Sequence, residues 1–140
     1  MKTFKTSREI PALPEKIFAA FNDPSRLAKW WGPSGFSNSF SLFQFNPGGK
    51  WSFVMHGPDG RNYLNEAEFI DIIPNEKIAI RHHSQPYFTL TILLTKSTKG
   101  TVVHWIQEFD DDEVAKSVAH IVEPSNEQNL DRLATEVCGN

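Results

Sequence analysis

Aromatic side chains are the residues of this sequence best suited to holding a ligand. The 140 residues include 11 Phe and 4 Trp but only 2 Tyr. Because Phe has no polar group, this many predict a dry interior or the wall of a dry pocket. For each residue, plain core packing is the competing interpretation. We expect a cavity wall that contains the following aromatic and apolar residues: Trp31, Phe36, Phe53, Met55, Tyr63, Phe88, Trp105 and Leu130.

Two polar residues fall on the apolar faces of expected strands. His82 shares a face with Ile78 and Ile80, and Gln107 lies between Trp105 and Phe109. A buried imidazole or amide needs hydrogen-bond partners, so each could be a satisfied polar group of the core. The alternative is that His82 and Gln107 anchor a carbonyl or hydroxyl of a ligand.

The candidates for catalysis are few, and we assign no catalytic residue. The sequence lacks a Gly-x-Ser-x-Gly elbow, and its single Cys, Cys138, lies near the end of the chain. Acid–base chemistry would depend on His82, Tyr63 and Glu66. Tyr63 and Glu66 have opposite parity on one strand, so they are expected to face opposite sides. Binding is therefore favoured over catalysis.

Neither a metal nor a cofactor is expected. His82 and His83 are adjacent on a strand and point to opposite faces, and no Cys-x-x-Cys pair occurs. The segment Pro47-Gly48-Gly49 lacks the Lys-Ser/Thr pair of a phosphate-binding loop and predicts a hairpin turn.

Composition narrows the classes of partner. The net charge is −3 and no basic run occurs, which argues against nucleic acid. No apolar stretch approaches the roughly 20 residues that span a bilayer, so membrane insertion is not expected. A single Cys and a polar N-terminal segment without a signal-peptide pattern favour the cytoplasm.

The elements expected around these residues form one domain over residues 1–140. Pro14 should begin a short helix that ends before Pro24, and Asp23 or Ser25 should cap a second one. A long C-terminal helix should start at the acidic run 110–113 and be kinked or interrupted by Pro124, with Ser125 and Gln128 as a capping box. Strands are expected over residues 2–9, 38–46, 51–56, 61–73, 77–84, 86–96 and 101–109.

This order predicts an α+β fold. Consecutive hairpins form a curved antiparallel sheet of about seven strands, with two short helices after the first strand. A shift of apolar parity between Phe40 and Phe43 indicates a bulge. The C-terminal helix is the only element long enough to cover the apolar face of the sheet.

Several motifs resemble one known family. Trp30-Trp31-Gly32-Pro33, Pro47-Gly48-Gly49-Lys50-Trp51-Ser52-Phe53, Gly57-Pro58-Asp59-Gly60 with Tyr63, and the segment 126–133 are similar to motifs of the homologues of the activator of heat-shock protein 90 ATPase. This family is part of the START-like superfamily of birch-pollen-allergen relatives, also called SRPBCC. The resemblance implies the helix-grip fold.

Three functions follow as expectations. The first is the carrying or sensing of a small hydrophobic molecule in a cavity between sheet and helix. The resemblance implies two alternatives: an enzyme similar to polyketide cyclases or dehydratases, and a module that interacts with a chaperone. A homodimer is left open.

Overall fold

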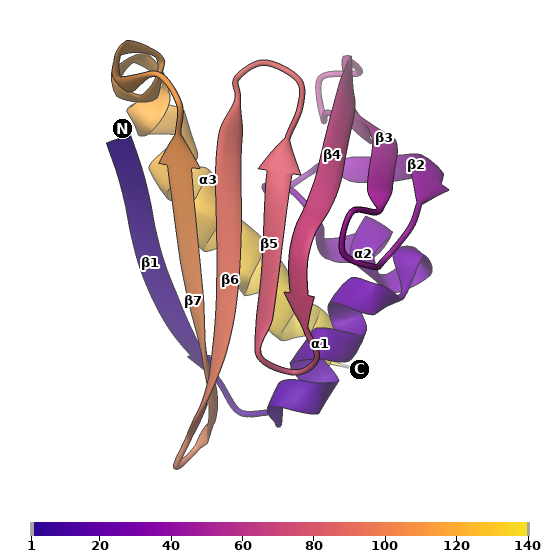
Figure 1. Ribbon diagram of the computed structural model, residues 1–140, viewed down its shortest axis with the longest axis vertical. Helices are drawn as coiled ribbons and strands as arrows, with labels where there is room; N and C mark the ends of the chain where they lie inside the picture. Colours follow the sequence, from indigo (N-terminus) through magenta and orange to yellow (C-terminus); the bar gives the residue numbers. More distant parts are fainter. Residues whose placement is uncertain (1, 140) are drawn as a thin grey trace.

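The computed structural model describes residues 2–139, which form a seven-stranded antiparallel sheet and three helices (Figure 1). The elements are β1 (Lys2–Ile10), α1 (Pro14–Asn22), α2 (Pro24–Trp30), β2 (Ser37–Phe43), β3 (Lys50–His56), β4 (Asn62–Ile73), β5 (Lys77–His82), β6 (Phe88–Ser97), β7 (Gly100–Phe109) and α3 (Asp112–Cys138). The sheet order is β1-β7-β6-β5-β4-β3-β2. The predicted α+β class and order of elements are confirmed.

The two short helices begin and end where the local sequence requires. Pro14 occupies the start of α1, and the helix stops at Asn22 because a residue before Pro leaves the helical region. Asp23, one of the two predicted caps, caps α2: its Oδ1 accepts a hydrogen bond from the Ser25 N–H over 3.0 Å.

The bulge in β2 is confirmed, since the register with β3 shifts between Phe40 and Leu42. β2 nevertheless ends at Phe43, earlier than predicted, because the next residues turn back toward β4. The Phe69 N–H donates to the Gly49 carbonyl over 2.9 Å. A Cβ on Gly49 would lie 2.0 Å from the Gln44 carbonyl oxygen, so only glycine fits this turn.

Helix α3 is continuous through Pro124, so the predicted interruption is wrong. A proline removes one N–H, which would have bonded the carbonyl four residues earlier, on His120. Pro124 and His120 are both exposed, so that carbonyl lies on the solvent side of the helix. The capping box also does not form, because no helix starts at Ser125. Gln128 Oε1 instead accepts from the Ser34 N–H over 3.1 Å.

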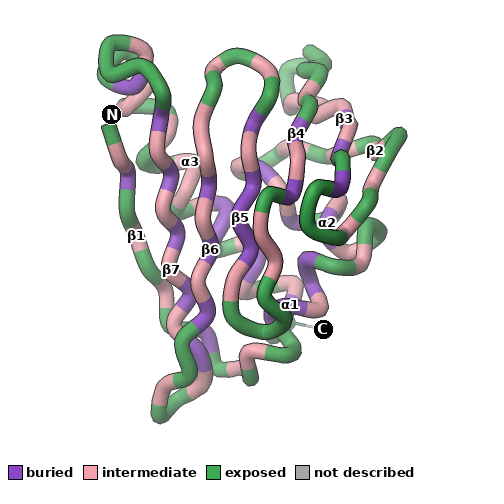
Figure 2. The backbone as a smooth tube through the Cα atoms, viewed as in Figure 1, coloured by how far each residue is buried: buried purple, intermediate pink, exposed green. Residues whose placement is uncertain are grey.

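Two apolar clusters join α3 to the sheet. The larger one holds Leu130, Leu133 and Val137 against the strands and the short helices. The smaller one holds Phe4, Phe109 and Ala115 near the start of α3. Buried positions alternate with less buried ones along β6 and β7, as one covered face requires (Figure 2).

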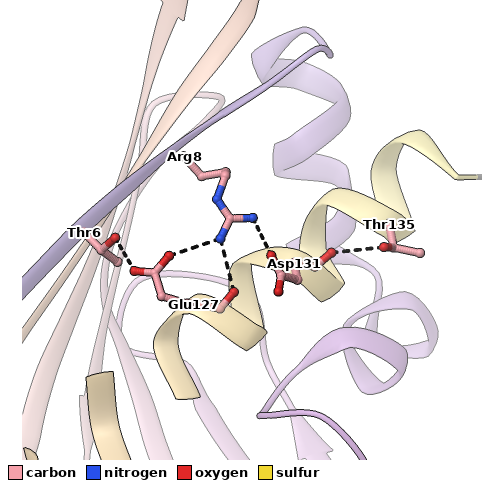
Figure 3. Close-up of polar contacts among 5 residues, drawn as sticks. All are labelled: Thr6, Arg8, Glu127, Asp131 and Thr135. Carbon is pink, nitrogen blue, oxygen red and sulfur yellow. Dashed lines mark hydrogen bonds and ion pairs between the residues drawn. The ribbon is translucent and has the colours of Figure 1, made fainter. Parts of the chain in front are cut away.

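A polar latch ties the middle of α3 to β1 (Figure 3). The Arg8 guanidinium donates to Asp131 Oδ1 over 2.7 Å and to Glu127 Oε1 over 3.1 Å. Thr6 Oγ1 donates to the other oxygen of the Glu127 carboxylate. The latch straddles the first residue that α3 gives to the larger cluster, since Glu127 precedes Leu130 and Asp131 follows it.

Candidate functional site: a cavity beneath helix α3

A cavity of about 670 Å³ lies between the concave face of the sheet and α3. Its wall consists of the loop at residues 31–36, residues of β3 to β7, Gln85 and Pro86 between β5 and β6, and the face of α3 that carries Ile121, Asn126 and Asn129. Between Ala115 and Asn129, α3 has no fully buried residue among those described. The helix therefore spans the sheet there without filling the space below it.

Aromatic rings form most of the apolar wall. The Trp31 ring lies 4.9 Å from that of Trp51 and 6.0 Å from that of Trp105, measured between centroids. Phe53 stacks on Trp51 at 4.4 Å. Aromatic rings pair in offset-stacked or edge-to-face arrangements, so a ring on a ligand can pack against these side chains in either way.

His82 is a buried polar group with partners on both ring nitrogens. Nδ1 lies 2.9 Å from the Pro86 carbonyl oxygen, and Nε2 lies 2.7 Å from Asn65 Oδ1. Its ring stacks on Phe88 at 4.4 Å. Burial lowers the pKa of His82 below its usual value, although the hydrogen bond to the Pro86 carbonyl acts in the opposite direction. Burial thus favours the neutral ring, which carries a single N–H, so in that form only one of the two oxygens accepts a hydrogen bond from it.

Gln107 has a different environment. Its Oε1 accepts a hydrogen bond from Asn126 Nδ2 over 3.1 Å, which joins β7 to α3 across the cavity wall. Its amide nitrogen has no partner among residues 2–139, although the residue is only 8% exposed. The indole nitrogens of Trp51 and Trp105, in contrast, are fully buried and have no acceptor in this part of the chain.

The loop at residues 31–36 closes one side of the cavity, and a single arginine anchors it. The Arg132 guanidinium donates to carbonyl oxygens at distances of 2.6 to 3.2 Å. These oxygens belong to Lys29, Trp31, Gly32, Pro33 and Phe36. A cation at this point also complements the C-terminal end of α2.

Asn129 supports the same loop from the next turn of α3. Its Nδ2 donates to the Trp30 carbonyl over 3.0 Å, and its Oδ1 accepts from the Gly32 N–H over 3.2 Å. Gly32 has a φ of +95°, and a Cβ there would lie 2.7 Å from the Met55 methyl carbon. The positive φ favours glycine at position 32, whereas the Met55 methyl group is the flexible end of a side chain and can move aside.

The structure brings most of the predicted site residues to one cavity wall: Trp31, Phe36, Phe53, Met55, Tyr63, His82, Phe88, Trp105 and Gln107. Leu130 is not in the wall, because it faces the larger apolar cluster and is fully buried there. Glu66 is also outside it, as the parity of β4 predicts.

Sequence reasoning missed several residues of the site. Trp51 has the same strand parity as Phe53 and Met55, which could have placed it in the wall. Asn126, Asn129 and Arg132 recur at intervals of three, which puts them on one side of a helix. Polar residues at that spacing beside Leu130 and Leu133 were the available signal.

Two further classes of site can be assessed from the described residues. Within residues 2–139, no three His, Cys, Asp or Glu side chains come together in a way that could hold a metal ion. None of the helices in this range is long and apolar enough to cross a membrane.

A seven-stranded sheet curled around one long helix, with a cavity between them, defines a helix-grip domain of the START-like class. The chain belongs to the family described as Activator of Hsp90 ATPase homolog 1-like protein, whose model matches residues 11–137. The resemblance seen in the sequence motifs is thereby confirmed. Among curated proteins, none matches the chain significantly.

Solved structures share the fold over nearly the whole chain. A protein of Chromobacterium violaceum is 25% identical, with a TM-score of 0.85 and 98% of each chain covered. A protein of Arthrobacter aurescens is 21% identical, with a TM-score of 0.89, covering 99% of this chain and 87% of the other. An AHSA1 protein of Silicibacter pomeroyi is 23% identical, with a TM-score of 0.78 and 96% of each chain covered.

Proposed function

We propose that the protein binds a small hydrophobic molecule in the cavity beneath α3. The observation that carries the proposal is the cavity itself: about 670 Å³, walled by Trp31, Trp51, Phe53 and Trp105. This volume lies within the range of small-molecule sites, roughly 300–1,000 Å³. Most of its wall is apolar, so the expulsion of water by an apolar ligand supplies the driving force.

The residues of the cavity wall fit ligand binding better than they fit catalysis by proton transfer. No Asp or Glu of the described chain lines the cavity, and Glu66 lies outside it. Burial lowers the pKa of His82, and its two ring nitrogens lie against the Pro86 carbonyl oxygen and Asn65 Oδ1 within the protein. A proton-transfer enzyme needs an acid and a base within reach of the substrate, and His82 has no acidic partner in this wall.

Titration with N-phenyl-1-naphthylamine, an uncharged dye that fluoresces in apolar surroundings, tests the proposal. We expect a saturable rise in fluorescence with one site per chain. Ala67→Leu adds a larger side chain to the cavity wall and should weaken binding about tenfold or more. The matched control is Glu66→Leu, which adds the same side chain on the opposite face of β4.

The result that overturns the proposal is equal dye binding by the two variants, with each variant shown to be folded by circular dichroism. Co-purified ligand, detected by native mass spectrometry of the chain from its host, would give independent support.

A further inference from the structure

The charge of the cavity wall restricts the ligand more narrowly than its size does. Around the cavity the described wall contains no Lys, Arg, Asp or Glu. Its titratable groups are His82, whose pKa burial lowers, and Tyr63, which is 42% exposed. A carboxylate, phosphate or ammonium group on the ligand would lose its hydration here without gaining an opposite charge.

Among the described residues, the wall presents to a ligand one buried hydrogen-bond donor without a partner, the Gln107 amide nitrogen. It has no acceptor among residues 2–139, whereas the indole nitrogens of Trp51 and Trp105 are fully buried and out of reach of a ligand. By contrast, His82, Asn65 and Asn129 already use their polar atoms within the protein. A ligand that covered this nitrogen without offering an acceptor would leave it unsatisfied, so a ligand that supplies an acceptor is preferred.

Gln107 is the main hydrogen-bond donor for a ligand because of its place on β7. Trp105 and Gln107 lie two residues apart on the inward face of β7, so a ligand stacked on the indole has its edge near the amide. The bond from Asn126 holds the Gln107 oxygen and leaves its NH₂ group for the ligand. Gln107 is therefore a preorganised donor in an apolar surrounding, where a hydrogen bond is strong.

We infer that the cavity selects uncharged, flat ring compounds that carry a carbonyl-type oxygen, which accepts a hydrogen bond from the Gln107 amide. This inference rests on the proposed function and narrows it to one ligand class. It excludes fatty acids, other carboxylates and protonated amines as the preferred ligands.

Three compounds with one ring skeleton test the inference by displacement of N-phenyl-1-naphthylamine. Fluorene is flat and has no oxygen, 9-fluorenone adds a carbonyl, and 9-oxofluorene-4-carboxylate adds a negative charge. We expect 9-fluorenone to bind about three- to tenfold more tightly than fluorene, although fluorene is the more hydrophobic. The carboxylate should bind at least about tenfold more weakly than 9-fluorenone.

A substitution of Gln107 tests whether this residue causes the preference for 9-fluorenone over fluorene. Gln107→Met keeps an unbranched side chain of similar length without the amide, and should make 9-fluorenone bind no better than fluorene. His104→Leu, on the opposite face of β7, is the control and should keep the preference.

Each result has one meaning. Equal affinity for fluorene and 9-fluorenone, or tight binding of the carboxylate, overturns the inference and leaves the proposed function standing. A preference that persists in a folded Gln107→Met variant also overturns it. If none of the three compounds displaces the dye and the dye itself does not bind, the proposed function fails and the inference fails with it.

Discussion

Arg132 lies where three parts of the molecule meet: the end of α2, the loop at residues 31–36, and α3. Its guanidinium replaces water for several backbone carbonyls that the loop cannot pair by itself. Because the loop contributes Trp31 and Phe36 to the cavity, a residue outside the wall controls the shape of the wall.

Loss of this group should loosen the loop. Arg132→Gln is expected to lower the free energy of unfolding by about 2 kcal/mol, because charged hydrogen bonds to carbonyls are lost. Urea denaturation measures this change, and hydrogen exchange should be faster at the amides of residues 32–36. Arg132→Lys should restore only part of the stability, since an ammonium group reaches fewer carbonyls. The exposed Arg61→Gln serves as a control, and an equal loss there would contradict the role.

His82 makes stability depend on pH in a definite direction. The unfolded chain binds a proton at a histidine near pH 6.5, whereas the folded chain, in which burial lowers the pKa of His82, does so only at lower pH. The unfolded state therefore binds more protons between the two values. The contribution of His82 to stability is fully present above about pH 6.5 and is lost as the pH falls through and below it.

We expect His82→Gln to flatten this part of the profile. Urea denaturation at pH 7.5, 6.5 and 5.5 gives the slope, and the exposed His120→Gln is the matched control. If the His82 variant loses stability as steeply as the parent chain over this range, the explanation by burial is wrong.

At the scale of the elements, α3 combines two different halves. Its C-terminal half packs through Leu130, Leu133 and Val137 and also carries Asp131 of the Arg8 latch. The half before Asn129 is held by the smaller cluster and by the other ion pair of the latch, at Glu127. The two ion pairs of the latch are partly exposed, so each contributes little by itself. The half above the cavity is thus the less firmly packed one, which suits a cover over a binding site.

Pro124 lies in this less firmly packed half and offers a test. Pro124→Ala restores a backbone N–H and a favourable helix residue at an exposed position. We expect the free energy of unfolding to rise by about 1–3 kcal/mol. Thermal and urea denaturation measure it. A decrease would show that the proline stabilises the helix in its bound position over the sheet.

At the scale of the whole molecule, ligand binding and stability are linked. A ligand that binds only the folded chain, at a free concentration one hundredfold above its Kd, should raise the free energy of unfolding by about 2.7 kcal/mol. With N-phenyl-1-naphthylamine as the ligand, the urea midpoint should move accordingly. Ala67→Leu should show a much smaller shift, and an undiminished shift would place the dye outside the cavity.

The fold could be predicted because its signals are local. Alternation in β7 placed Trp105 and Gln107 on the inward face, and Pro14 and Asp23 marked the ends of the short helices. The role of Arg132 could not be predicted, since its partners are backbone carbonyls about one hundred residues away. Leu130 was misplaced because neighbouring positions on a helix face different directions: residue 129 lines the cavity and residue 130 the core.

The pairing of β1 with β7 has a consequence for how the chain is made. Lys2 pairs with Phe109, and within the sheet β1 has no neighbour other than β7. A ribosome that adds about 5–20 residues per second needs about 5–20 seconds to progress from one strand to the other. During synthesis β1 therefore remains unpaired until β7 has been made, while the hairpins from β2 to β6 can already form. Closure of the sheet is a late, long-range event, which predicts slow folding compared with a helical bundle of the same size.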